Sequence, residues 1–194
     1  MRLFITSLIM TVVLTLLLGI VYPLAMTGVA QLLFPTQANG SMVEVNGKVV
    51  GSALIGQSFS SPKFFASRPS AAGTGYDPLA SGASNLGPTS KALMDRVTHD
   101  VDSLRLLHPD WNQPLPGDML TTSASGLDPD ISVANALLQA PQVAKANAIE
   151  PEKVKALVER QIEGRSLGFL GEPHLNVLAL NIELLKLTGQ AAHH

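Results

Sequence analysis

The first 34 residues are apolar almost throughout, and the pattern of the chain changes after them. No charged residue lies between Arg2 and Glu44, and the run from Leu3 to Leu24 is almost wholly apolar. A helix rises about 1.5 Å per residue and a bilayer core is about 30 Å thick, so about 20 apolar residues cross it. Because backbone polar groups in hydrocarbon need internal partners, we predict a membrane-spanning helix within residues 1–35.

The apolar run also admits a second interpretation, a cleaved secretory signal. Arg2 supplies a minimal positive start, and Gly28 and Ala30 are small residues at the spacing of a cleavage site. The apolar character continues to Phe34, however, and exceeds the usual length of a signal core. The length favours a permanent anchor, with Pro23 as the expected position of a kink.

The flanking charges predict the orientation of this helix. Arg2 and the α-amino group precede it, whereas the first basic residue after it, Lys48, is balanced by Glu44. Positive charge marks the cytoplasmic side, so we expect a cytoplasmic N-terminus. The chain that follows mixes apolar and polar residues, and we expect one outer domain over residues 36–190 and a short tail over 191–194.

The outer domain opens with a strand pattern. Residues 42–50 alternate apolar and polar side chains around Asn46-Gly47. This pair suits the two positions of positive φ in a tight turn, so we predict a β-hairpin. Residues 51–59 either extend the hairpin or form a further strand. Residues 60–88 carry repeated Pro and Gly and are expected to be a long irregular loop, of a length that is often functional.

Helical spacing of apolar side chains dominates the second half of the chain. Ser132 is expected to cap one helix, Pro141 to open the next and Gly189 to end the last. Few strands with several helices predict the α+β class. The predicted helices cover residues 89–107, 132–139, 141–146, 151–162 and 175–187.

Charge and motif content exclude several functions. Arg2 apart, 12 basic and 15 acidic residues make the outer part mildly acidic and without a basic run, which argues against a nucleic-acid partner. The sequence contains no cysteine and no HExxH, GxSxG or GxxxxGK[ST] motif. Neither a zinc site, a nucleophile elbow nor a phosphate loop is therefore indicated. We expect no catalytic residue, no metal ligand and no directly bound cofactor.

Two stretches, residues 81–88 and 121–129, are unusually rich in small hydroxyl residues and glycine. Such residues allow close backbone approach and satisfy nearby N–H groups with their own side chains. We expect tight internal loops, with partner contact as the alternative, and we expect an arginine nearby to clamp a carboxylate or backbone carbonyls. The candidate structural or partner-contact residues are Arg68, Ser81, Ser84, Asn85, Ser123, Ser125, Asp128 and Asn176.

The predicted span carries one narrow face of small residues. Ser7, Thr11, Thr15 and Gly19 recur every four positions. Small and hydroxyl residues let helices approach closely in lipid, so we expect this face to pack on another transmembrane helix.

A series of short motifs recurs in order along nearly the whole chain: Tyr22-Pro23-Leu24, Gln37 to Ser41, Gly51 to Gln57, Ser67 to Ser70, Ser81 to Leu86, Ser123 to Asp128, Gln139 to Ala146, and Gly171 with Asn176-Val177 and Leu180-Asn181. With these motifs the chain resembles the C subunit of the Kdp-type potassium-transporting ATPase, a bacterial potassium uptake complex. Ala83 replaces a glycine common in that family. Gln142 and Asn147 replace two common arginines, which weakens any role in holding phosphate.

The resemblance implies three partners: a channel-like potassium-binding subunit, a P-type ATPase subunit and a small single-span peptide. It implies that ATP and magnesium bind the ATPase subunit, and that potassium is the transported ion. We expect a non-catalytic accessory subunit in the bacterial inner membrane, its C-terminal domain in the periplasm at the external face of the channel-like subunit. Two alternatives are a catalytic chaperone that raises the ATPase subunit's affinity for ATP, and a lone anchored or secreted periplasmic binding protein.

Overall fold

A computed structural model describes residues 1–109 and 111–189. The chain divides into two compact units, residues 1–43 and the residues from 44 onward, and each is described by itself. Residue 190 and the expected tail, residues 191–194, lie outside the described residues.

The first unit is mostly one long helix. It runs through α1 (Arg2–Leu16), a π-helical turn η1 (Leu17–Val21) and α2 (Tyr22–Leu33). None of its residues is buried, and its length and composition suffice to cross a membrane, which confirms the helix prediction. The π turn lies immediately before Pro23. Because proline lacks an N–H and its ring crowds the preceding turn, a wider turn accommodates it.

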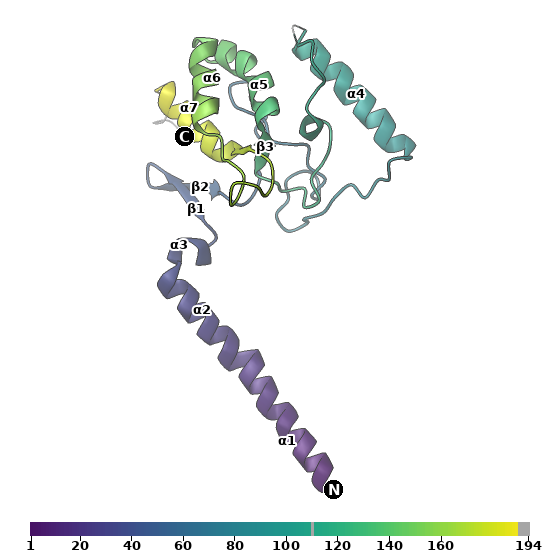
Figure 1. Cartoon of the computed structure of the whole chain (residues 1–194), viewed down its shortest axis with the longest axis vertical. Coiled ribbons are helices and arrows are strands. Elements are labelled where there is room, and N and C mark those ends of the chain that lie inside the picture. Colours follow the sequence, from purple (N-terminus) through teal and green to yellow (C-terminus); the bar gives the residue numbers. More distant parts are fainter. Residues whose placement is uncertain (110, 190–194) are drawn as a thin grey trace. The chain divides into compact units, whose positions relative to one another are not determined.

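A short helix, α3 (Pro35–Ala38), follows the long one (Figure 1). The side-chain amides of Gln31 and Asn39 bond to each other in both directions at 3.3 Å. Asn39 also donates to the carbonyl of Pro35 at 2.7 Å. These bonds fix the turn in which α2 ends.

The predicted hairpin is confirmed. Strands β1 (Met42–Val45) and β2 (Lys48–Ser52) pair, and Asn46 and Gly47 have φ of 53° and 76°, as this turn type requires. The further strand allowed for residues 51–59 is wrong: β2 ends at Ser52. The described stretch 53–90 contains neither helix nor strand, as expected for residues 60–88.

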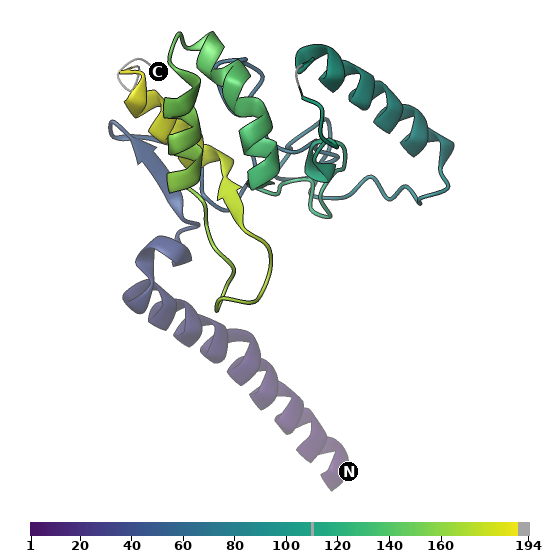
Figure 2. The same cartoon turned by 45° about the horizontal axis from the view of Figure 1, so that its top comes forward.

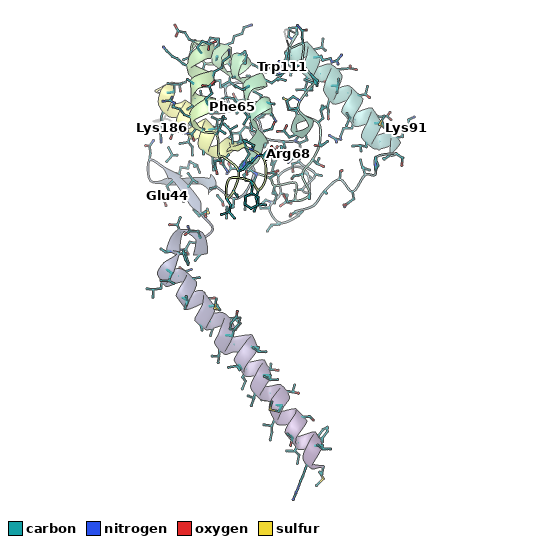
Figure 3. The ribbon with its side chains drawn as sticks, in the orientation of Figure 1. Glu44, Phe65, Arg68, Lys91, Trp111 and Lys186 are labelled. Atoms are coloured by element: carbon teal, nitrogen blue, oxygen red, sulfur yellow. The ribbon has the colours of Figure 1, made fainter. Side chains whose placement is uncertain are left out.

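Three helices form the hydrophobic core of the second unit (Figure 1): α5 (Val133–Ala146), α6 (Pro151–Arg160) and α7 (Val177–Leu187). Helix α6 buries Val154, Leu157 and Val158. Phe65, from the irregular stretch, is wholly buried in this core (Figure 3). Helix α5 buries its small residues Ala136, Ala140 and Ala144, which let α6 pack close.

Two of the helix predictions are corrected. Helix α5 continues through Pro141, where the sequence predicts a break between 139 and 141. The proline side chain is exposed, so its ring faces solvent and the lost N–H interrupts one intrahelical bond without ending the helix. Helix α7 begins at Val177 rather than Leu175, and Ser132 caps α5 by accepting from Asn135 N–H at 3.1 Å, as predicted.

The structure contains a second two-stranded sheet that the sequence did not predict. Its strands directly precede α5 and α7 in the chain. Strand β3 (Asp130–Ser132) pairs antiparallel with β4 (His174–Asn176). Ile131 faces Leu175 in the register, and both are buried. Residues 175 and 176 thus belong to a strand instead of the predicted last helix. These small sheets and helices confirm the α+β class.

Helix α4 (Lys91–Leu107) matches the helix predicted for 89–107, and a short 3₁₀ turn, η2 (Gly117–Met119), follows. Ser90 occupies the N-cap position without a side-chain capping bond. None of the residues of α4 is buried, and the helix lies to one side of α5, α6 and α7 in both views (Figures 1 and 2).

Candidate functional site

Arg68 and Asp128 form an ion pair between two irregular segments. Arg68 Nη1 lies 2.6 Å from Asp128 Oδ2, and the two side chains are 23 % and 27 % exposed. The carbonyl of Arg68 also accepts a hydrogen bond from the Tyr76 hydroxyl. The structure therefore brings together two candidates that lie 60 positions apart, and Arg68 contacts a carboxylate.

Further bonds join the same segments, residues 68–82 and 123–128, which we call the loop junction. The carbonyl of Ser125 accepts from Ser81 Oγ at 3.0 Å and from Gly82 N–H at 2.8 Å. Ser123 Oγ lies 3.4 Å from Ser125 Oγ. The candidates Ser81, Ser123 and Ser125 thus bond within the chain and bring the two hydroxyl-rich stretches side by side.

The loop junction depends on a glycine at its centre. Gly126 has φ of 67°, and a Cβ at this position would lie 2.6 Å from the carbonyl oxygen of Gly82 and 2.7 Å from the N atom of Ala72. Its own carbonyl accepts from Ser70 Oγ at 2.6 Å. The backbone at Gly126, Gly82 and Ala72 therefore meets at a distance that a side chain would prevent.

Three remaining candidates lie elsewhere. Ser84 is half-buried, and Asn85 is exposed with φ of 51°; the structure brings neither into the hydrogen bonds described for the loop junction. Asn176 caps α7 by accepting from Ala179 N–H at 3.1 Å. Its Nδ2 donates to the carbonyl of Ala53 at 2.8 Å, so Asn176 holds the irregular stretch against β4.

A shallow pocket of about 310 Å³ adjoins the ion pair, and its walls include Arg68, Asp118, Asp130 and His174. The His174 ring bonds to the Glu172 carbonyl, which raises the pKa of His174. Burial raises the pKa of Asp130. Among the residues that the structure describes, no group of three or more His, Asp or Glu side chains could hold a metal ion.

Asp118 is a structural residue that sequence reasoning missed. Its carboxylate accepts from Ser132 N–H at 2.8 Å, from Ser132 Oγ at 2.9 Å and from Asn135 Nδ2 at 2.9 Å. It therefore orders the start of α5 from a different segment. The residues that Asp118 bonds lie 14 to 17 positions away in the sequence, and no local motif predicts these bonds.

A larger cavity of about 330 Å³ lies between α4 and α5. Aromatic and apolar side chains such as Phe59 and Leu104 form its walls, together with the amides of Gln139 and Gln142. None of the described residues that line it is a lysine or an arginine. His108 lines it as well, and burial lowers the pKa of His108, so its imidazole is neutral at neutral pH.

The four small residues of the span make no contact outside their helix in this structure. Ser7 Oγ donates to the carbonyl of Phe4 at 2.9 Å, and Thr11 Oγ1 to that of Ser7 at 2.8 Å. Thr15 is exposed, and a Cβ added at Gly19 would meet nothing within 4 Å. The face they form is open.

Comparison with known proteins decides the family. The model of the KdpC family, described as the K+-transporting ATPase c chain, matches residues 4–186. The chain belongs to the KdpC family. KdpC proteins that it resembles include the potassium-transporting ATPase KdpC subunits of Koribacter versatilis, 53 % identical over 93 % of this chain and 92 % of the relative, and of Methylobacterium nodulans, 53 % identical over 95 % and 96 %. The KdpC subunit of Caulobacter vibrioides is 55 % identical over 86 % of this chain and 84 % of the relative.

Proposed function

We propose that this chain is a non-catalytic accessory subunit of an ATP-driven potassium uptake complex, anchored by the helix Arg2–Leu33. The family match over residues 4–186 carries the proposal. The proposed partners are a channel-like potassium-binding subunit, a P-type ATPase subunit and a small single-span peptide. ATP and magnesium belong to the ATPase subunit in this proposal, and potassium is the ion transported.

The outer domain is proposed to lie in the periplasm, against the external face of the channel-like subunit. One observation supports a positioning role and another supports the orientation. The irregular segments of this domain are tied together by the loop junction and by the Arg68–Asp128 pair, and are thus suited to present a fixed surface. The charge of the flanking residues, with Arg2 before the span and Lys48 beside Glu44 after it, supports the orientation.

Direct contact with ATP is not favoured by the chemistry of the domain. The cavity between α4 and α5 offers a neutral His108 and no basic side chain among its described lining, whereas a nucleotide phosphate needs cationic or N–H donors. Gln142 lines this cavity at a position where the resemblance leads one to expect an arginine.

Protease accessibility tests the orientation. In right-side-out spheroplasts, external protease is expected to digest the outer domain and leave the span protected. Digestion only in inverted vesicles would reverse the orientation and restore the ATP-chaperone alternative. N-terminal sequencing of the mature chain distinguishes the anchor from a signal cleaved after Ala30.

Co-purification tests the packing face of the span. Gly19→Leu is expected to release the chain from the detergent-solubilised complex, because a large side chain would hold the neighbouring helix away. Gly28→Leu is the matched control: this glycine also has open space around it and lies about two and a half helical turns further on, on the opposite side. Equal retention of both variants would remove the proposed face.

A further inference from the structure

The π turn changes which donor reaches the carbonyl of Leu18. Tyr22 N–H donates to the carbonyl of Leu17, five positions earlier. In α-helical register the same N–H would donate to the carbonyl of Leu18. The turn therefore takes from Leu18 the donor that a regular helix would supply.

The next possible donor is also missing. In the wider register of the π turn, the carbonyl of Leu18 would accept from residue 23, which is Pro23 and has no N–H. Thr11 Oγ1 donates to the carbonyl of Ser7 and Thr27 Oγ1 to the carbonyl of Pro23, so neither of these two hydroxyl groups serves Leu18. Within the described residues, the Leu18 carbonyl thus receives neither of the backbone donors that continue a helix.

The position of this carbonyl makes the missing bond costly. Leu18 lies near the middle of the 32-residue helix Arg2–Leu33, and thus deep in the hydrocarbon of a bilayer that the helix crosses. Water is scarce there, and an unsatisfied backbone group is strongly disfavoured. A donor from outside the chain removes that cost.

The residue after Leu18 allows a neighbouring helix to come close. Gly19 has no side chain, and nothing lies within 4 Å of the position that its Cβ would take. A second helix can therefore approach the backbone closely at this depth.

We propose that the backbone carbonyl of Leu18 accepts a hydrogen bond from a hydroxyl or amide side chain of a neighbouring transmembrane helix in the assembled transporter. This inference rests on the proposed function, because it requires a partner helix. It adds what that partner must carry: a polar donor, Ser, Thr, Asn or Gln, near mid-membrane. The π turn and Pro23 are then part of the recognition surface.

Selective isotope labelling tests the bond directly. The chain contains four Leu-Gly pairs, at Leu18, Leu86, Leu167 and Leu170, so ¹³C-carbonyl leucine with ¹⁵N-glycine gives four correlated NMR signals. Leu18→Ile identifies the signal of Leu18 by removing it. We expect its carbonyl shift to move downfield when the full chain in bilayers is assembled into the complex. A signal that does not move, or that has the bonded shift in the chain alone, would overturn the proposal.

Restoring the missing N–H provides a second test. Pro23→Ala gives the helix its own donor, so the partner's donor loses its acceptor, and retention in the detergent-solubilised complex is expected to fall about three- to tenfold. Pro35→Ala, at the start of α3, is the matched control and is expected to leave retention unchanged. In isolated Pro23→Ala, the Leu18 signal should already lie downfield and so mark the bonded shift.

The outcomes separate this inference from the proposed function. If the unsubstituted chain does not co-purify with transporter subunits, the proposed function fails. If it co-purifies, but Pro23→Ala is retained equally and the Leu18 signal stays in place, only the hydrogen bond is refuted.

Discussion

The side-chain amide of Asn181 bonds both backbone polar groups of Phe65, as a neighbouring strand would in a sheet. Its Oδ1 accepts from Phe65 N–H at 2.8 Å and its Nδ2 donates to the Phe65 carbonyl at 2.9 Å. Gln139 does the same for Ala66, at 2.7 and 3.2 Å. Two amides on helices α7 and α5 therefore satisfy a buried segment that belongs to no sheet.

Asn181→Leu is expected to lower the free energy of unfolding by about 2–5 kcal/mol, because it leaves both polar groups of Phe65 buried without partners. Thermal unfolding of the full chain in detergent measures the loss. Gln113→Leu, an exposed amide, is the control and should change stability little. A similar loss in both variants would contradict the role assigned to Asn181.

The Arg68–Asp128 pair is expected to behave as a coupled unit. Arg68→Met and Asp128→Asn should each lower stability by about 1–3 kcal/mol, because each leaves a half-buried charged partner without its bond. The double variant should lose less than the sum of the two. A double-mutant cycle from urea unfolding measures the coupling, and strictly additive losses would show that the pair contributes nothing.

Gly126→Ala separates close approach from backbone strain. Gly171 has a similar positive φ, 79°, but open space around it. Gly171→Ala should therefore cost only the conformational penalty of about 1–2 kcal/mol, whereas Gly126→Ala adds a clash with Gly82 and Ala72. Protease resistance of the outer domain should fall for Gly126→Ala alone. Equal losses of protease resistance in the two variants would mean that the loop junction accommodates the added methyl group without a clash.

Pro141→Ala is expected to raise the melting temperature. Alanine restores the N–H inside α5 and has higher helix propensity by about 3 kcal/mol, partly offset by about 1 kcal/mol of added unfolded-state entropy. Pro151→Ala, at the first turn of α6, is the comparison and should give no such gain, because no intrahelical acceptor awaits its N–H. No gain at Pro141 would mean that α5 is already adapted to the proline.

Two histidines are expected to give opposite slopes of stability against pH. The pKa of His174 is raised in the folded protein. Its contribution to folding stability is therefore present below pH 6.5 and is lost as the pH rises through its folded pKa. The pKa of His108 is lowered, so stability is lost as the pH falls from 6.5 toward its folded pKa. Melting temperatures between pH 5 and 8.5 should thus contain a maximum near 6.5 from these two groups.

Variants assign the two slopes. His174→Gln should flatten the profile above pH 6.5, and His108→Gln should flatten it below. His99→Gln, whose side chain is 82 % exposed, serves as the control. Unchanged slopes in both test variants would refute the assignment.

The elements that the sequence predicted well have local signals. Asn46-Gly47 determines a turn by its own backbone preference, and the apolar residues of α6 recur within ten positions. Strands β3 and β4 have three residues each, which is too short to show an alternation of apolar and polar residues. They form because they pair with each other, although they lie far apart in the sequence. Pro141 is a fair helix-start signal that tertiary packing overrides.

The same distinction between local signals and distant pairing applies to the candidate residues. Arg68 and Asp128 were each recognisable as unusual, but their pairing depends on the fold of 60 intervening residues. Asn181 has no signal in its own helix, because its partners lie 116 positions away. Ser84 and Asn85 share the composition of the loop junction without its hydrogen bonds, since composition alone does not say which hydroxyl or amide meets which carbonyl.

The contact between Phe65 and Asn181 sets the order in which the outer domain is completed. Asn181 lies in α7, the last described helix, so Phe65 emerges from the ribosome long before its partner. Contacts of such sequence separation close late and slowly. Gln139 in α5 can bond Ala66 earlier, but the buried N–H and carbonyl of Phe65 wait until nearly the whole chain has been synthesised. A chain stopped before α7 would lack more than a helix, because Phe65 would have no partner for its backbone groups.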